Sequence, residues 1–151
     1  MDILDYKIPK VEVRAYIALD NGLTFEQDEY VIFLDQFSRY RKSEQSIYEF
    51  LNSKNGFIPL KNCDAGEFLI VNINDVVYVK EKEKFIGQYE RKIKLQMENN
   101  FLLEVDHINP LPDSHSRVLD YLNQETDFLL FYHDDRKIFI NKKKILRVKD
   151  R

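Results

Sequence analysis

Residues 46–62 read SIYEFLNSKNGFIPLKN, and residues 117–133 read RVLDYLNQETDFLLFYH. The two segments align without a gap, and in each an apolar helical face is followed by a strand-like run. The identical positions include Leu51 with Leu122, Asn52 with Asn123, and Phe57 with Phe128. Internal similarity at a fixed spacing is the signature of a repeated structural unit. The sequence therefore predicts a duplicated protein.

The similarity continues downstream after a deletion of two residues in the second copy. Residues 69–80, LIVNINDVVYVK, align with residues 138–149, IFINKKKILRVK. Asn72 then lies opposite Asn141, and most other pairs match apolar with apolar. We interpret the chain as two related repeats that are joined by a charged linker. The predicted bounds are 1–86 for the first repeat, 87–151 for the second and 80–90 for the linker.

Each repeat is predicted to begin with two strands. Residues 11–19 alternate apolar and polar side chains with the period of a half-buried strand. Asp20, Asn21 and Gly22 supply a tight turn, because Asn and Gly tolerate the backbone conformations of hairpin turns. In the first repeat, the return strand is predicted at 30–35. In the second repeat, the corresponding pair is a strand at 93–97, an Asn99–Asn100 turn and a return strand at 101–105.

A short helix should follow the strand pair in each repeat. Ile47, Phe50 and Leu51 recur at helical spacing and define one apolar face. Leu51 and Leu122 are therefore expected to be equivalent core residues. The predicted caps are Ser43 and Ser114 at the N-termini, with Asn52 and Asn123 at the C-termini in left-handed conformation.

The remaining predicted strands close each repeat after the helix. They cover residues 57–61, 67–72, 75–80, 128–132, 137–141 and 144–149, with connections of two or three residues between the last two strands of each repeat. Residues 15–22, AYIALDNG, followed by residues 33–37, FLDQF, resemble the first motif of Sm-like proteins, and residues 138–145, IFINKKKI, resemble the second. The resemblance implies a mainly β protein with short helices, built from two tandem, related small SH3-like or Sm-like β-barrel units. The helix departs from the Sm-like order, which places it before the first strand.

Composition narrows the class of protein. The 151-residue chain carries a net charge of −3, with 8 basic and 13 acidic residues in positions 1–75 against 15 and 13 in positions 76–151. Such balance is unlike the marked basic excess of a dedicated nucleic-acid binder. With Cys63 alone, no intrachain disulfide can form. No apolar run approaches the roughly 20 residues of a bilayer span, so we expect a cytoplasmic protein without membrane insertion.

Signatures of catalysis are scarce in this sequence. Four glycines supply no phosphate-binding loop, and no G-x-S-x-G or H-E-x-x-H motif occurs. His133-Asp134-Asp135 offers possible metal ligands, but it falls at a predicted hairpin turn, where Asp is an ordinary turn residue. We therefore predict a protein that is not an enzyme and that uses neither a cofactor nor a metal.

Two basic clusters remain as candidate binding residues. They comprise Arg39, Tyr40 and Arg41 in one loop, with Lys142, Lys143, Lys144 and Arg147 near the C-terminus. Small β units recruit partners by strand addition, which favours an adaptor or regulator that binds a protein and that can also form an oligomer. RNA binding is the alternative, because Arg and Tyr clamp phosphates and stack on bases. We expect the three lysines, as turn residues, to be replaceable by Glu without loss of the fold.

Overall fold

The computed structural model describes residues 10–36, 45–85, 87, 91–107 and 115–150. These residues form ten strands, two short α-helices and three single-turn 3₁₀ helices. The first half contains β1 (Lys10–Asp20), β2 (Phe25–Asp35), α2 (Ile47–Leu51), β3 (Phe57–Asn62), β4 (Phe68–Asn72), η1 (Ile73–Asp75) and β5 (Val76–Lys84). The second contains β6 (Arg91–Met97), η2 (Glu98–Asn100), β7 (Leu102–His107), α3 (His115–Leu122), β8 (Phe128–His133), β9 (Arg136–Asn141), η3 (Lys142–Lys144) and β10 (Ile145–Asp150).

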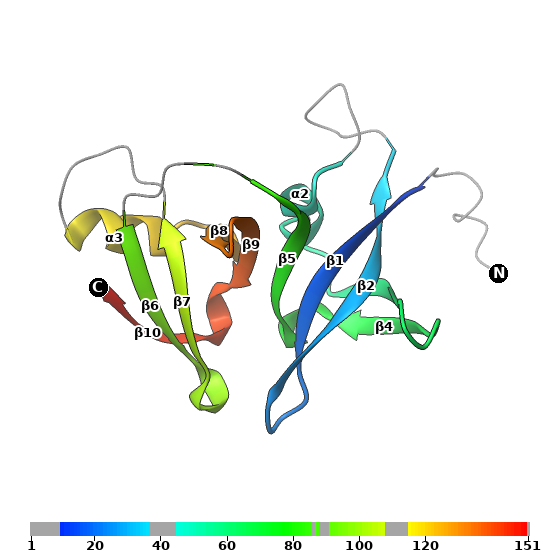
Figure 1. The fold of residues 1–151 in the computed structure, drawn as a ribbon, viewed down its shortest axis with the longest axis horizontal. Helices are drawn as coiled ribbons and strands as arrows, with labels where there is room; N and C mark the ends of the chain where they lie inside the picture. Colours follow the sequence, from blue (N-terminus) through cyan, green and yellow to red (C-terminus); the bar gives the residue numbers. More distant parts are fainter. Residues whose placement is uncertain (1–9, 37–44, 86, 88–90, 108–114, 151) are drawn as a thin grey trace.

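The ten strands belong to one antiparallel sheet. Their order is β10-β6-β7-β8-β9-β5-β1-β2-β3-β4, so the sheet joins the two halves through β9 and β5. Figure 1 shows the halves side by side with these two strands between them. The prediction of a mainly β protein with short helices is confirmed. The strands form a continuous open sheet, because hydrogen bonding between β5 and β9 extends one set of strands into the other.

The two halves order and register their strands in the same way. β5-β1-β2-β3-β4 in the first half corresponds to β10-β6-β7-β8-β9 in the second. Phe57 pairs with Asn72 as the aligned Phe128 pairs with Asn141. The first and last strands of each half also share an irregular register, which skips Val77 in one half and Leu146 in the other.

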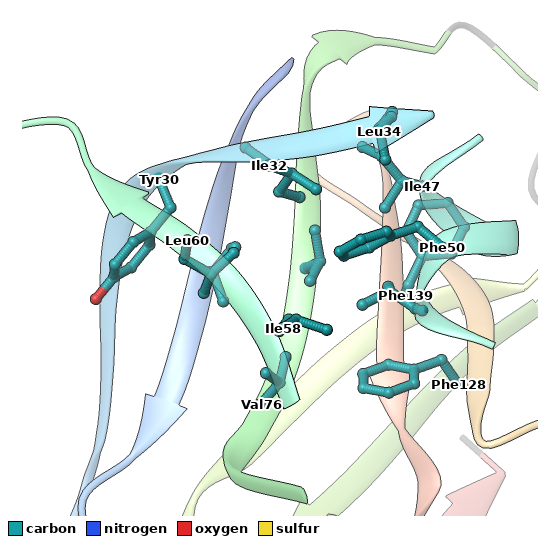
Figure 2. Packing of buried hydrophobic residues seen from close by; sticks show 14 residues of the cluster. Tyr30, Ile32, Leu34, Ile47, Phe50, Ile58, Leu60, Val76, Phe128 and Phe139 are labelled. Carbon is teal, nitrogen blue, oxygen red and sulfur yellow. The ribbon is translucent and has the colours of Figure 1, made fainter. Parts of the chain in front are cut away.

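Two hydrophobic clusters fill the interior, and each draws residues from both halves. The first cluster surrounds α2 and includes Phe128 and Phe139 of the second half. Figure 2 shows these two rings among side chains of the first half. The second cluster lies mainly in the second half but includes Val77 and Tyr78 of β5. The apolar core is therefore continuous across the pairing of β5 with β9.

The predicted turns form for the expected reasons. Gly22 has a φ of 93°, and the Asn21 side chain accepts hydrogen bonds from the amides of Leu23 and Thr24. Asn99 and Asn100 likewise adopt positive φ between β6 and β7. Asp134 and Asp135, with φ of 53° and 56°, make the turn between β8 and β9. Both Asp residues therefore serve as hairpin-turn residues.

The helix ends differ in detail from the sequence-based expectation. Ser46 caps α2, since its hydroxyl accepts a hydrogen bond from the Glu49 amide at 3.1 Å. The predicted caps Ser43 and Ser114 lie outside the described residues. Asn52 does end α2, but its φ of −99° is not left-handed. Its carboxamide hydrogen-bonds elsewhere, as the next subsection shows.

The predicted linker is partly wrong. Residues 80–84 continue β5, and Lys80 is almost fully buried beside the β9 strand. The charged stretch therefore begins as part of the sheet: β5 pairs with β1 and β9, while the side chains of residues 82–84 remain exposed. None of the helices in the described residues has the length and apolar character of a membrane span.

Candidate functional site

The pairing of β5 with β9 creates an interface inside the chain, here called the β5–β9 junction. Val79 lies opposite Phe139, and Tyr78 lies opposite Ile140. Phe139 is 3% exposed and packs in the first-half cluster, where its ring contacts Tyr48 at a centroid distance of 5.9 Å. The hairpin of β8 and β9 thus covers α2 and β5 with its side chains.

Asn52 binds the start of β8 across this junction. Its Oδ1 accepts hydrogen bonds from the amides of Asp127 and Phe128 at 3.0 and 2.9 Å. The Nδ2 atom donates to the Tyr48 carbonyl at 3.0 Å. From the other side, the buried Asn141 donates to the Val76 carbonyl at 3.0 Å. Asn52 and Asn141 therefore connect the two halves by hydrogen bonds. Each also serves locally, since Asn52 ends α2 and Asn141 caps η3.

The corresponding face of the second half is open. Between α3 and β10 lies a groove of about 770 Å³, here called the α3–β10 groove. Its apolar lining comes from Val118, Leu119 and Leu122 on α3 with Ile145, Leu146 and Val148 on β10. Leu119 and Leu146 are each 57% exposed. Polar and basic side chains, including Asn123, Lys142, Arg147 and Lys149, complete the lining.

An unpaired strand edge borders the groove. Within the described residues, β10 pairs with β6 on one side and has no strand on the other. β4 occupies the opposite end of the strand order and, among the described strands, pairs with β3 alone. Unpaired edges offer backbone hydrogen bonds to an added strand. The α3–β10 groove therefore combines apolar side chains with a backbone edge.

The structure places the predicted lysine cluster on η3, at one end of the groove. The Lys142 ammonium donates to the Gln124 carbonyl, and Lys143 donates to Asn74 Oδ1 at 3.3 Å. Lys144 forms a salt bridge with Asp20 at 3.0 Å, and both side chains are mostly buried. The ammonium groups of all three lysines thus bind oxygen atoms of the protein itself.

The Lys144–Asp20 pair links the start of the second half's last strand to the first hairpin. Burial works to raise the pKa of Asp20, but hydrogen bonds from the Gly22 amide and from Lys144 outweigh it, so this pKa lies below its ordinary value. Replacement of all three lysines by Glu would place a carboxylate against Asp20. We therefore revise the expectation that this change leaves the fold intact.

The other predicted site residues are distributed differently. Arg147 is exposed on β10 and lines the α3–β10 groove. Arg39, Tyr40 and Arg41 lie outside the described residues. The sequence analysis missed Leu119 and Leu146 as site residues. Their signal was an apolar residue at the positions aligned with Tyr48 and Val77, whose side chains pack against residues of the second half.

His133 and Lys80 meet at the hairpin of β8 and β9. Lys80 Nζ lies 3.4 Å from His133 Nδ1 and 3.8 Å from a carboxylate oxygen of Asp134. Burial lowers the pKa of His133 and of Lys80, although Asp134 opposes both shifts. Among the described residues, no group of three or more His, Cys, Asp or Glu side chains is arranged to hold a metal ion.

No family model, no curated protein sequence and no solved structure matches this chain.

Proposed function

We propose that this chain is a non-catalytic adaptor or regulatory protein that binds a protein partner in the α3–β10 groove. The observation that carries the proposal is the juxtaposition of exposed Leu119 and Leu146 with the unpaired edge of β10. An added strand or hairpin would bury the leucines and pair with the backbone of β10. Arg147 and Lys149 at the same strand favour a partner with acidic side chains.

We further infer that each half is one copy of a duplicated small barrel-like unit. The shared strand order, the shared register and the matching irregularity at Val77 and Leu146 support this inference. The aligned Asn72 and Asn141 also cap equivalent 3₁₀ turns, each accepting a hydrogen bond from the amide two residues ahead. With duplication, the face of the first half that is covered through β9 has a counterpart in the second half, the α3–β10 groove, which no described strand covers.

Affinity capture with matched leucine variants tests the proposed function. Immobilised wild type, Leu119→Glu and Leu102→Glu are incubated with nuclease-treated and untreated extracts of cells that produce the protein. Leu102 is 75% exposed on β7 and does not line the groove, so its variant is the control. We expect wild type and Leu102→Glu to retain the same protein after nuclease treatment, and Leu119→Glu to lose it.

Two results would contradict this function. Equal capture by all three proteins would show that the groove is not the binding surface. Capture that disappears on nuclease treatment would favour the RNA-binding alternative, although Lys142, Lys143 and Lys144 already contact oxygen atoms of the protein itself.

A further inference from the structure

We propose that the chain associates head to tail with a second copy of itself, the β3–β4 edge of one copy docking into the α3–β10 groove of the next. The inference rests on the protein-binding function of the groove and names its partner. It follows from the β5–β9 junction, where the chain already makes this contact with itself. Each half has a helix–strand face and a hairpin face, and among the described residues one face of each kind has no strand paired with it.

The first unused face is the hairpin of β3 and β4, which corresponds to the hairpin of β8 and β9. In the junction, Phe128 and Phe139 are 1% and 3% exposed because they pack against the first half. The residues that align with them are Phe57 and Ile70. These are 62% and 80% exposed. The β3–β4 hairpin therefore presents two large apolar side chains where its counterpart buries two.

The second unused face is the α3–β10 groove itself. Val77 of β5 is fully buried and packs in the cluster of the second half. Its aligned residue on β10 is Leu146, which is 57% exposed. Leu51 is buried at 3%, whereas the aligned Leu122 is only partly buried. The same positions are thus covered in the first half and uncovered in the second.

The matched asparagines complete the correspondence. Asn52 accepts the amides of Asp127 and Phe128, and its aligned residue Asn123 lies exposed in the groove. The positions aligned with Asp127 and Phe128 are Gly56 and Phe57. In a head-to-tail pair, the Asn123 carboxamide accepts the amides of Gly56 and Phe57 from the next copy.

The internal register specifies the strand pairing between copies. Val79 lies opposite Phe139 in the junction. Because Val148 and Ile70 are their aligned residues, β10 and β4 should pair with Val148 opposite Ile70 of the neighbouring copy. Antiparallel pairing in this register would satisfy both unpaired edges and bring apolar side chains into cross-strand contact.

Charge favours the same orientation. Residues 1–86 carry a net charge of −4 and residues 87–151 a net charge of +1. Head-to-tail docking places the acidic first half of one copy against the slightly basic second half of the next. Groove-to-groove docking would instead oppose two copies of Arg147 and Lys149, which line the same groove.

Such an interface is heterologous, since two different surfaces of the chain meet. Repetition of a heterologous contact produces a ring when the rotation closes and a filament when it does not. Either product satisfies the proposal, because both use the same contact. A symmetric dimer that buries two grooves against each other does not.

Sedimentation velocity of the full chain over a range of concentrations tests this contact. The variants are Leu146→Glu, which alters only the groove, and Ile70→Glu, which alters only the hairpin. Both positions are exposed, so the fold should survive, and circular dichroism verifies that it does. We expect wild type and the control Leu102→Glu to form oligomers, and each variant alone to remain monomeric.

Mixing the two variants gives the decisive measurement. Leu146→Glu keeps an intact hairpin and Ile70→Glu keeps an intact groove, so the mixture contains one functional pair of faces. A head-to-tail contact therefore predicts a heterodimer of one copy of each variant and no larger species. Loss of association in Leu146→Glu but not in Ile70→Glu would overturn the proposal in favour of a groove-to-groove dimer.

The two proposals fail in distinguishable ways. A wild type that is monomeric at all concentrations overturns self-association. If Leu119→Glu still abolishes capture of another protein in that case, the groove binds a different partner and the proposed function stands. If neither self-association nor groove-dependent capture occurs, both proposals are wrong.

Discussion

At the scale of single residues, the aligned Asn52 and Asn123 show how one residue type can serve both local and tertiary structure. Asn52 and Asn123 each follow a short helix, and the backbone amide of each donates to the carbonyl four residues earlier. Asn52 also accepts hydrogen bonds from the amides of Asp127 and Phe128 in the other half, whereas Asn123 lies exposed in the α3–β10 groove. The same local role therefore accompanies different surroundings: Asn52 is half-buried and Asn123 is exposed.

Replacing these two asparagines separates the local role from the tertiary one. Asn52→Ala should lower the free energy of unfolding by about 1–3 kcal/mol, because the amides of Asp127 and Phe128 lose their acceptor. Asn123→Ala should change it by less than about 0.5 kcal/mol, as expected for an exposed site. Urea denaturation at a concentration where the protein is monomeric measures both values. Equal losses would show that Asn52 acts only as a helix end.

The two helices show the same contrast at the scale of elements. α2 is covered on its apolar side by the first-half strands and by Phe128 and Phe139. α3 packs Val118 into the second cluster but leaves Leu119 exposed beside β10. Similar amphipathic segments thus acquire different burial from what is packed against them.

Truncation of the aligned leucines tests this difference. The sequence predicts equivalent core positions, whereas the structure buries Leu51 and leaves Leu122 partly exposed to the groove. Leu51→Ala should cost about 2–5 kcal/mol, the range for a buried leucine. Leu122→Ala should cost clearly less in the monomer, because fewer of its contacts are lost. Thermal unfolding of the two variants compares them, and a larger loss for Leu122→Ala would contradict the assigned burial.

For the whole molecule, the sheet and both clusters cross from one half to the other. The second half supplies Phe128 and Phe139 to the first cluster, and the first supplies Val77 and Tyr78 to the second. Neither half therefore has a self-contained interior. Units of about 65 residues also bury a smaller share of their surface than larger domains do.

Expression of residues 88–151 alone tests this mutual dependence. Separation from β5 would expose Phe128 and Phe139, and burial of one such side chain contributes about 1.5–3 kcal/mol. We expect the fragment to bind a hydrophobic dye and to unfold over a broad temperature range. The full chain under the same conditions is the reference. A sharp transition of the fragment at the temperature of the full chain would show that the shared core is dispensable.

The strand and helix types were accessible from sequence because they depend on local periodicity. Alternation over 11–19 indicated β1, and the Asn-Gly and Asn-Asn turns marked the hairpins that join β1 to β2 and β6 to β7. The boundaries were less accurate. β2 begins at Phe25 rather than at 30, and β5 extends into the predicted linker (80–90) as far as Lys84. The charged side chains on these extensions interrupt the apolar periodicity, so the sequence pattern did not predict these parts of the strands. Pairing with neighbouring strands stabilises them in the structure.

By itself, the sequence determined the mainly β class, the positions of the turns and the similarity of the two halves, since each depends on residues close together in the chain. Only the tertiary structure decided which apolar residues are covered. Phe57 and Phe128 are the same residue type at matched positions, yet one is 62% and the other 1% exposed. The physical reason is that burial requires a neighbouring element: β9 covers β5, whereas no strand among the described residues covers β10 on its outer side. The candidate site therefore lies beside β10, at one end of the strand order among the described residues.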